Sequence, residues 1–345
     1  MKLEEFDYNL PKELIAQLPS EKRENSKMLV LNRQALSFED KHFYDITDFL
    51  DENDFLVMNN TKVIPARLFS VKDTGAKIEI FLVRETEPHK WIALIKPSKR
   101  VKPLMELKIG ENLSAKIIEK IDDKWKIQLN YCGNIYDVLG TYGNIPLPPY
   151  IERNMTDSQY KSLDFDRYQT VYAKHEGSVA APTAGLHFTR DIIDKLEKKG
   201  VGHTFVNLNV GLGTFKPVKA KNIEEHSMDR ETFEISEEAA NSINKAKAEG
   251  KNIVAVGTTS VRTLETTMRK YGKILPVKDY SELFIYPPYD FKIVDKMITN
   301  FHLPKSTLLM LVSAFAGKDF VFKAYNHAIN SKYRFYSYGD CMLIL

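Results

Sequence analysis

The middle of the chain is a series of short apolar runs separated by turn-forming Gly, Pro and Asp residues. Four of these runs are rich in β-branched and aromatic residues and cover residues 77–83, 91–95, 113–118 and 124–129. Short strands at similar spacing, without a helical period, are typical of a small β-barrel or sandwich. We therefore predict an inserted β-barrel in this part of the chain.

The flanking sequence has a different pattern, in which strand-like runs alternate with helical ones. The apolar run 252–256 precedes a helical stretch at 260–270, and 297–301 precedes another at 307–316. Residues 191–199 form a further amphipathic helix, for which Thr189 is the expected N-cap. Alternating strands and helices predict an α/β fold.

Residues 54–58 also read as a strand, so both ends of the chain contribute to the α/β part. The simplest topology is a larger α/β domain of residues 1–65 and 150–345, with an inserted small β-barrel domain of residues 66–149. The proline-rich stretch 144–150 is the expected return linker.

Composition narrows the class of protein. The chain has 345 residues, enough for two domains, and Lys plus Arg exceed Asp plus Glu by 49 − 46 = 3. A nucleic-acid partner would therefore have to be bound by a local basic patch. The longest apolar run, 308–312, is too short to span a bilayer, and acidic residues occupy the start, so we expect a cytoplasmic protein with no membrane association. Two cysteines and eight histidines form no common metal motif, so we expect no structural metal.

Residues 177–189 are the most informative segment. They combine two glycines, Pro182 and several alanines with the single histidine His187, a composition that allows close approach to a ligand. Residues 257–262 lie between a strand and a helix, where free backbone amides and hydroxyls favour an anion or carboxylate. The alternative is that Thr258 or Thr259 merely caps the helix while Arg262 pairs with an acid.

Three further segments carry candidate chemistry. Gly211 and Gly213 could admit a ligand, although a tight turn is the simpler reading and no dinucleotide fingerprint is present. His302 lies at a predicted strand end before a helix capped by Ser306 or Thr307, although an isolated histidine is more often structural. Residues 334–340 combine Arg, aromatic and carboxylate side chains suited to holding a base, or form an ordinary final strand.

Seven blocks of this sequence together resemble the S-adenosylmethionine:tRNA ribosyltransferase-isomerase family of the queuosine pathway. The blocks run nearly end to end and cover residues 6–11, 59–67, 168–174, 177–189, 257–262, 299–315 and 333–340. The resemblance implies an enzyme with an α/β domain and an inserted β-barrel. It also implies transfer of the ribosyl moiety of S-adenosylmethionine to the aminomethyl group of 7-aminomethyl-7-deazaguanine at the tRNA wobble position. We take a monomer as the default oligomeric state.

In that reaction the sulfonium acidifies the ribose C5′ hydrogens, a base forms an ylide, adenine leaves, the substrate amine attacks, and rearrangement to epoxyqueuosine expels methionine. S-adenosylmethionine is then a substrate, and no cofactor is expected. Proton transfer is assigned first to His187 and second to His302. The residues expected to bind S-adenosylmethionine are Thr183, Gly185, Gly211, Gly213, Gly257, Thr258, Thr259, Ser260 and Arg262. Those expected to bind the base or the tRNA are Tyr338, Asp340, Arg334, Lys96, Lys99 and Arg100.

Three positions depart from the family pattern. Asn209 and Asp229 stand where relatives commonly have histidine, so neither position is expected to need a histidine, and Pro288 replaces a frequent glycine. Two other functions stay open: an S-adenosylmethionine-dependent RNA methyltransferase, and a noncatalytic RNA-binding protein. The first would release S-adenosylhomocysteine, the second no product, and the ribosyl transfer adenine and methionine.

Overall fold

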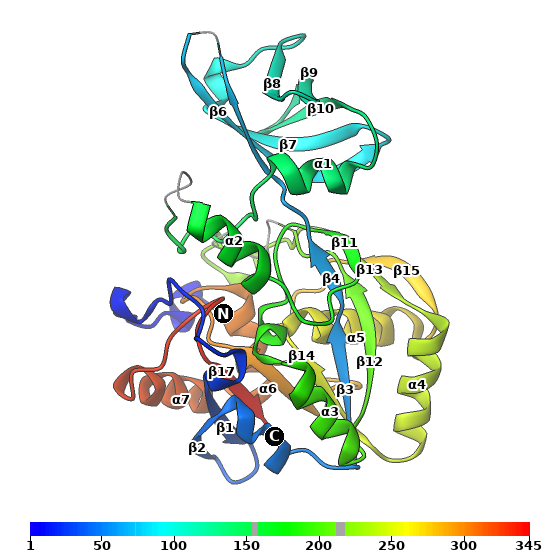
Figure 1. The fold of residues 1–345 in the computed structure, drawn as a ribbon. Helices are drawn as coiled ribbons and strands as arrows, with labels where there is room; N and C mark the ends of the chain where they lie inside the picture. The colour runs from blue at the N-terminus through cyan, green and yellow to red at the C-terminus, as the bar shows by residue number, and fades with distance from the viewer. Residues whose placement is uncertain (73, 154–157, 212–217) are drawn as a thin grey trace.

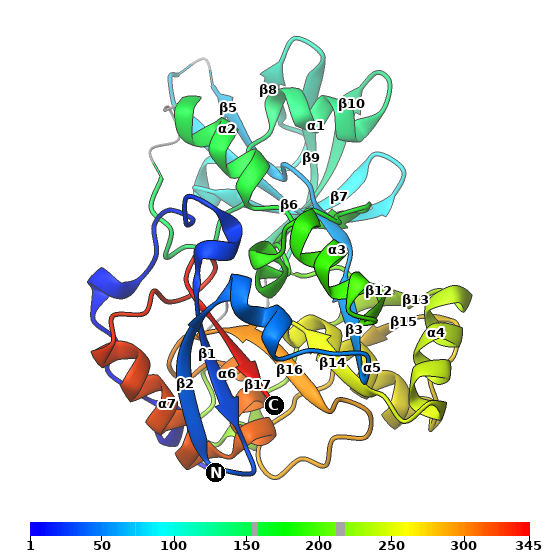
Figure 2. The same cartoon turned by 60° about the horizontal axis from the view of Figure 1, so that its bottom comes forward.

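The computed structural model describes residues 1–72, 74–153, 158–211 and 218–345. Two large sheets dominate the fold, which is of the mixed α/β type (Figure 1; Figure 2). In the view of Figure 1 the smaller sheet stands above the larger one.

The larger sheet takes strands from both ends of the chain. Its order is β15 (Val277–Ser281), β13 (Glu231–Ile235), β12 (Gly202–Leu208), β3 (Asp54–Asn59), β14 (Asn252–Val256), β16 (Lys296–Asn300), β17 (Cys341–Ile344), β1 (Lys27–Asn32) and β2 (Ser37–His42). Neighbours from β12 to β16 are parallel, as are β17 and β1, and the other pairs are antiparallel.

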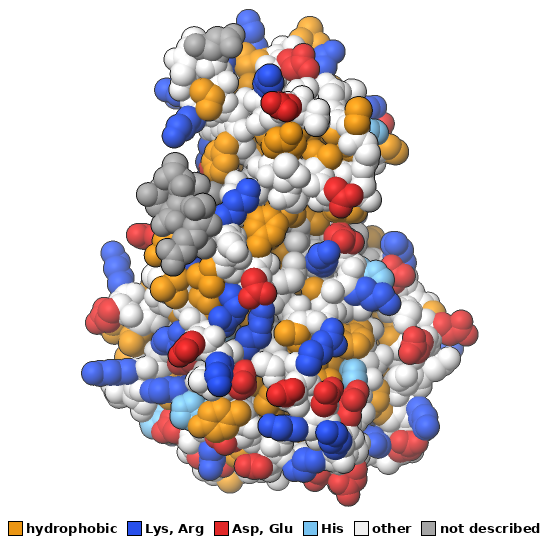
Figure 3. All heavy atoms as spheres, viewed as in Figure 1, with side chains coloured by type: hydrophobic (Ala, Val, Ile, Leu, Met, Phe, Trp, Pro, Cys, Tyr) orange, Lys and Arg blue, Asp and Glu red, His pale blue; other side chains and the backbone are white. Residues whose placement is uncertain are grey.

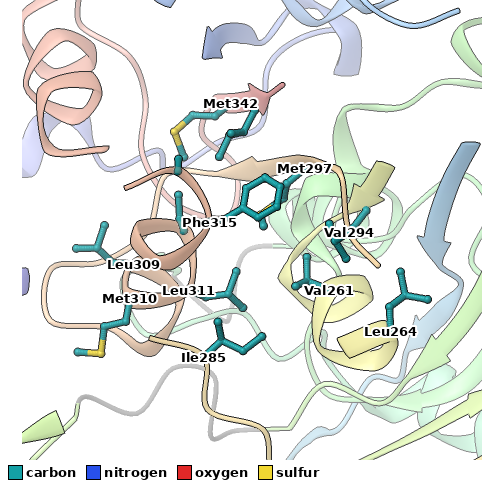
Figure 4. Close-up of a cluster of buried hydrophobic side chains, with 14 of the residues drawn as sticks. Val261, Leu264, Ile285, Val294, Met297, Leu309, Met310, Leu311, Phe315 and Met342 are labelled. Atoms are coloured by element: carbon teal, nitrogen blue, oxygen red, sulfur yellow. The ribbon is translucent and has the colours of Figure 1, made fainter. Parts of the chain in front are cut away.

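Helices cover both faces of this sheet because its strands are apolar on both sides. In β3, Phe55 and Val57 face one core while Leu56 and Met58 face the other. The first core is closed by α4 (Glu237–Ala248), α5 (Thr258–Tyr271), α6 (Thr307–Ala316) and α7 (Lys318–Asn330), and the second by α3 (Arg190–Lys198). Figure 4 shows side chains of α5 and α6 in the first core, together with Met297 of β16.

The smaller sheet has six antiparallel strands. Its order is β5 (Arg67–Val71), β6 (Lys77–Glu87), β7 (Lys90–Lys96), β10 (Lys124–Tyr131), β9 (Leu113–Ile121) and β8 (Glu106–Gly110). The hydroxyl of Ser70 in β5 donates to the carbonyl of Lys108 in β8 at 2.6 Å. The two edge strands therefore meet, and the sheet is nearly closed like a barrel. The remaining elements are β4 (Thr61–Val63) paired with β11 (His175–Ser178), α1 (Ile135–Tyr142) and α2 (Ser158–Arg167).

These observations confirm most of the predicted elements. Each strand predicted in the middle of the chain is present, and Thr189 and Ser306 cap α3 and α6 through their hydroxyls. The α5 helix begins two residues earlier than predicted, at Thr258, and its N-cap is Gly257. The elements without a predicted counterpart include the β1–β2 hairpin, β5, β8, β13, β15 and the helices α1, α2, α4 and α7. The assignment of residues 66–149 to a separate inserted domain stays a prediction. No helix in the described part of the chain is long and apolar enough to span a membrane.

Candidate functional site

A pocket lies at the carboxyl ends of β14 and β16, where open α/β sheets commonly bind ligands. Its walls come from residues 181–184, 257–259, 299–303 and 336–337, together with Tyr150 and Val210. Its cavity volume is about 60 Å³, or about 650 Å³ when the open mouth is counted, so the enclosed part is smaller than a usual ligand pocket. We call it the strand-end pocket. Four of the blocks singled out in the sequence, at 177–189, 257–262, 299–315 and 333–340, meet here.

The small-residue segment packs tightly against its surroundings, as its composition predicts. A Cβ on Gly185 would lie 2.1 Å from the hydroxyl oxygen of Tyr172, so only glycine fits without movement. Thr183 and the buried Ala184 line the strand-end pocket. Gly185 therefore allows the segment to pack against Tyr172, while its neighbours Thr183 and Ala184 line the pocket.

The α5 N-terminus forms a second wall. Gly257 adopts a φ of 86°, a left-handed conformation that favours glycine, and it turns the chain from β14 into the helix. Thr259 lines the pocket, and its buried hydroxyl has no hydrogen-bond partner among the described residues. A helix N-terminus also leaves backbone N–H groups without intrahelical partners. This wall can therefore donate several hydrogen bonds to an anionic or hydroxyl-rich ligand.

Other hydroxyl and charged side chains of the 257–262 block form hydrogen bonds and ion pairs within the protein. Ser260 donates to the carbonyl of Val256 at 2.8 Å. Arg262 is buried, forms an ion pair with Glu231, and does not line the strand-end pocket. Glu231 also accepts a hydrogen bond from the backbone N–H of Gly211 at 2.8 Å. Arg262 therefore pairs with a buried acid, while neither Thr258 nor Thr259 caps the helix.

His302 lines the strand-end pocket. Its Nε2 lies 2.9 Å from the hydroxyl of Thr299, and its backbone N–H donates to the hydroxyl of Tyr325 at 2.9 Å. Burial lowers the pKa of His302 to about 3, so the ring is neutral at pH 7. Nδ1 forms no hydrogen bond to any described residue. A neutral imidazole held in this way can accept a proton.

His187 lies behind the pocket wall and is only 4% exposed. Its Nδ1 is 2.6 Å from the hydroxyl of Ser26, and its Nε2 is 3.2 Å from Oδ1 of Asn300, which does line the pocket. Burial, reinforced by the charges of Arg334 and Arg23, lowers the pKa of His187 to about 4. The ring therefore reaches the strand-end pocket through Asn300.

The 334–340 block is largely committed to internal contacts. Tyr338 donates to Oδ1 of Asp164 at 3.0 Å, and Asp340 accepts from the backbone N–H groups of Lys27 and Arg334 at 3.0 and 2.7 Å. Burial raises the pKa of Asp340 above its usual value. The residues of this block that line the strand-end pocket are Tyr336 and Ser337, which sequence reasoning did not assign.

The remaining candidate residues that the structure describes do not line the strand-end pocket. Lys96 ends β7 of the six-stranded sheet, and Lys99 and Arg100 follow it in a short 3-10 helix. Lys99 and Arg100 line a shallow basic depression with Lys72 and Lys102. Gly213 lies outside the described residues. Among the residues that the structure describes, no group of His, Cys, Asp or Glu could hold a metal ion.

Sequence reasoning missed Ser26 and Asn300, the two partners of His187. Asn300 lies inside one of the seven blocks, but nothing in its neighbours distinguishes it from other polar residues at strand ends. Ser26 precedes β1 in a segment without any motif. Only the tertiary contact reveals their role.

Comparison with known proteins places this chain in one family. The family model described as queuosine biosynthesis protein matches residues 3–344. A curated S-adenosylmethionine:tRNA ribosyltransferase-isomerase from Sulfurihydrogenibium sp. (strain YO3AOP1) is 51% identical over 346 residues, covering 100% of both chains. A crystal structure of S-adenosylmethionine tRNA ribosyltransferase from Thermotoga maritima matches with a TM-score of 0.56 and 40% identity, over 99% of this chain and 100% of that one. The chain therefore belongs to the queuosine biosynthesis protein family, in which the relatives named above are ribosyltransferase enzymes.

Proposed function

We propose that this enzyme transfers and isomerises the ribosyl moiety of S-adenosylmethionine onto the aminomethyl group of 7-aminomethyl-7-deazaguanine at the wobble position of tRNA. The products are epoxyqueuosine-tRNA, adenine and methionine. The full-length relationship to the curated ribosyltransferase-isomerase is the observation that carries this proposal. The strand-end pocket supports it, because the pocket combines hydrogen-bond donors with a neutral histidine.

S-adenosylmethionine is proposed to lie in the strand-end pocket against the α5 N-terminus. There the methionine carboxylate or the ribose hydroxyls accept from backbone N–H groups of residues 258–260, and Thr259 supplies a hydroxyl that has no described partner. Arg262 supports this wall through its ion pair with Glu231 and does not itself touch the ligand.

Proton transfer is proposed for His302, with His187 as the residue that positions Asn300. The C5′–H bond beside the sulfonium breaks and its proton passes to the base. Its electron pair forms a C4′=C5′ double bond as the C4′–O bond breaks, the freed ring oxygen becomes an aldehyde at C1′, and adenine leaves and takes up a proton. The substrate amine then adds to C4′ and gives up a proton, the electron pair at C5′ forms a bond to C1′, and the alkoxide at C1′ displaces sulfur from C5′, which closes the epoxide and releases methionine. A neutral imidazole is in the correct protonation state to begin this sequence.

The tRNA is proposed to reach the pocket with its wobble base unstacked, since a stacked base would hide its aminomethyl group. Lys96 at the end of β7, with Lys99 and Arg100 of the following 3-10 helix, then contacts the RNA backbone. The enzyme is proposed to act as a monomer.

Two labelled forms of S-adenosylmethionine test the reaction with tRNA that carries the aminomethyl base. Ribose label should enter the RNA while adenine and methionine are released in equal amounts. Methyl label in the RNA, with S-adenosylhomocysteine as product, would show a methyltransferase instead, and absence of both labels would indicate a binding protein. His302→Gln should lower turnover by about 10²- to 10⁴-fold. His203→Gln is the matched control, because His203 lies on β12 outside the strand-end pocket.

A further inference from the structure

Three arginines from distant parts of the chain converge beside His187. Arg23 lies before β1, Arg167 is the last residue of α2, and Arg334 precedes β17. Arg23 and Arg167 line a small pocket with His187 and the serines Ser20 and Ser26. Arg334 reaches this pocket through a hydrogen bond to the Ser20 hydroxyl. We call this the arginine pocket.

Backbone carbonyls hold two of the guanidinium groups in place. Arg23 donates to the carbonyls of Leu186 and Asp166 at 3.2 and 2.9 Å. Arg167 donates to the carbonyls of Glu21 and Ser20 at 3.2 and 2.6 Å. A neutral carbonyl fixes a guanidinium without cancelling its charge, so the positive charges are positioned and remain uncompensated by these contacts.

Carboxylates compensate this charge only in part. Asp340 lies 3.4 Å from Arg334, but its two oxygens already accept from backbone N–H groups. Burial and then the charge of Arg167 lower the pKa of Arg23, while the carboxylate of Asp166 acts in the opposite direction. Nε of Arg167 is buried and has no hydrogen-bond partner among the described residues. Crowded like charges and an unused donor are what a bound oxyanion would satisfy.

The arginine pocket adjoins the strand-end pocket. Ser337 lines both, and His187 joins them because it lines the first and bonds to Asn300 of the second. Arg23, Arg167 and Arg334 are each partly exposed, so a ligand can reach them from the surface. Figure 3 shows Lys and Arg side chains gathered on the face just below α2.

We propose that the arginine pocket binds a backbone phosphate of the tRNA next to the nucleotide whose base enters the strand-end pocket. This inference rests on the proposed function. A phosphodiester carries a full negative charge that matches several guanidinium groups. The carboxylate of S-adenosylmethionine fits less well, because that molecule carries its own ammonium and sulfonium cations. The phosphate contact would fix the register of the RNA, while the strand-end pocket selects the base.

Binding of an anticodon stem-loop RNA with the aminomethyl wobble base tests the inference, measured over a range of salt concentrations. Arg167→Gln should weaken binding about tenfold at 0.1 M salt and lower the slope of log K against log salt by about 0.7 to 0.9. Arg167→Lys also loses the forked contacts with the carbonyls but keeps the charge, so it should retain most of the slope. Affinity for S-adenosylmethionine without RNA should be unchanged in both variants.

Arg33→Gln is the matched control. Arg33 is also half-buried and donates to backbone carbonyls, including those of Leu345 and Phe315. It comes directly after the carboxyl end of β1, whereas Ser26 comes directly before the amino end of that strand. Its RNA affinity should equal that of the wild type. A wild-type slope in Arg167→Gln, or equal losses in Arg167→Gln and Arg167→Lys, would overturn the phosphate assignment. A loss of S-adenosylmethionine affinity with intact RNA binding would do the same. Failure of the wild-type protein to bind the RNA would instead refute the proposed function, and the inference with it.

Discussion

Nε2 of His187 lies 3.2 Å from Oδ1 of Asn300, and the amide group of Asn300 donates to the carbonyl of Tyr336 at 2.9 Å. Because the amide nitrogen faces a carbonyl, the amide oxygen must face the histidine. A neutral His187 therefore carries its proton on Nε2, and Nδ1 faces the Ser26 hydroxyl at 2.6 Å, whose single proton is shared between Nδ1 and the carbonyl of Arg23. One ring thus fixes Asn300 in the wall of the strand-end pocket.

His187→Ala should abolish most turnover while leaving tRNA affinity nearly intact, because Asn300 loses the donor that orients it. His187→Gln can still donate toward Asn300 and should restore part of kcat. Steady-state kinetics and an RNA-binding assay on the same preparations measure both effects. Near-normal turnover in the alanine variant would show that this contact does not matter for the reaction.

The free energy of unfolding should fall as the pH is lowered from about 6.5 to 4. The unfolded chain binds protons at His187 and His302 near pH 6.5, whereas burial lowers the pKa of these groups to about 4 and about 3 in the folded protein. Each group therefore removes up to about 1.4 kcal/mol of unfolding free energy per pH unit in that window. Urea unfolding at several pH values measures the slope, which should be smaller in His187→Gln. An identical slope in that variant would contradict the pKa direction.

Thr259→Val should weaken S-adenosylmethionine binding by about fivefold to tenfold and leave the unfolding free energy nearly unchanged. The hydroxyl has no described partner to lose in the free protein, and Thr259 lines the pocket in which the ligand is proposed to bind. Calorimetric titration and thermal unfolding separate the two effects. Thr267→Val is the matched control within α5, because its hydroxyl donates to the carbonyl of Thr263 away from the pocket. Equal affinities of Thr259→Val and the wild type would remove Thr259 from the site.

Gly185→Ala should lower the unfolding free energy by about 1 to 3 kcal/mol, because the added methyl group would overlap the buried Tyr172. Gly140→Ala in α1 offers the comparison. No described atom outside its own helical turn lies within 4 Å of the place that its added methyl group would take, so the helix should gain up to about 1 kcal/mol. Chemical unfolding of the two variants side by side should give opposite signs. A neutral Gly185→Ala would mean that Tyr172 can move aside.

Arg262→Gln should destabilise the protein by about 3 to 5 kcal/mol, because Glu231 would be left as a buried charge without its guanidinium. The folded fraction should bind S-adenosylmethionine with an affinity within about twofold of the wild type. Unfolding curves and ligand titration distinguish these effects. A large loss of S-adenosylmethionine affinity at a normal unfolding free energy would indicate that Arg262 contacts the ligand, as its position in the sequence motif suggests.

Local sequence patterns predicted many of the helices and strands, but not which of their residues contact one another in the folded chain. The alternation of Val206 and Leu208 with Asn207 and Asn209 correctly assigns the two faces of β12. The hydroxyl of Ser306 lies just before an apolar helix, and it caps α6 as expected. Such features depend on residues within one turn or strand, and the sequence displays them directly.

The contacts that build the site depend on distant residues. His187 and Asn300 are 113 positions apart, and Arg262 and Glu231 are 31 apart. Spacing alone gives no reason to pair these residues, so Arg262 was assigned to the ligand and Asn300 received no role. The carboxyl ends of β14 and β16 bring the predicted blocks together, and that arrangement appears only in the folded sheet.

The position of β17 has a consequence for how the molecule folds. This strand lies between β16 and β1 in the larger sheet, and it pairs Met28 with Cys341, close to the two ends of the chain. Among the described strands of the sheet, β17 is the one that joins the β1–β2 hairpin to the others. Contacts of such high sequence separation carry a large loop-closure cost and slow the search for the native state. Completion of the sheet, and with it the placement of Ser26 beside His187, is therefore expected to be a late event in folding.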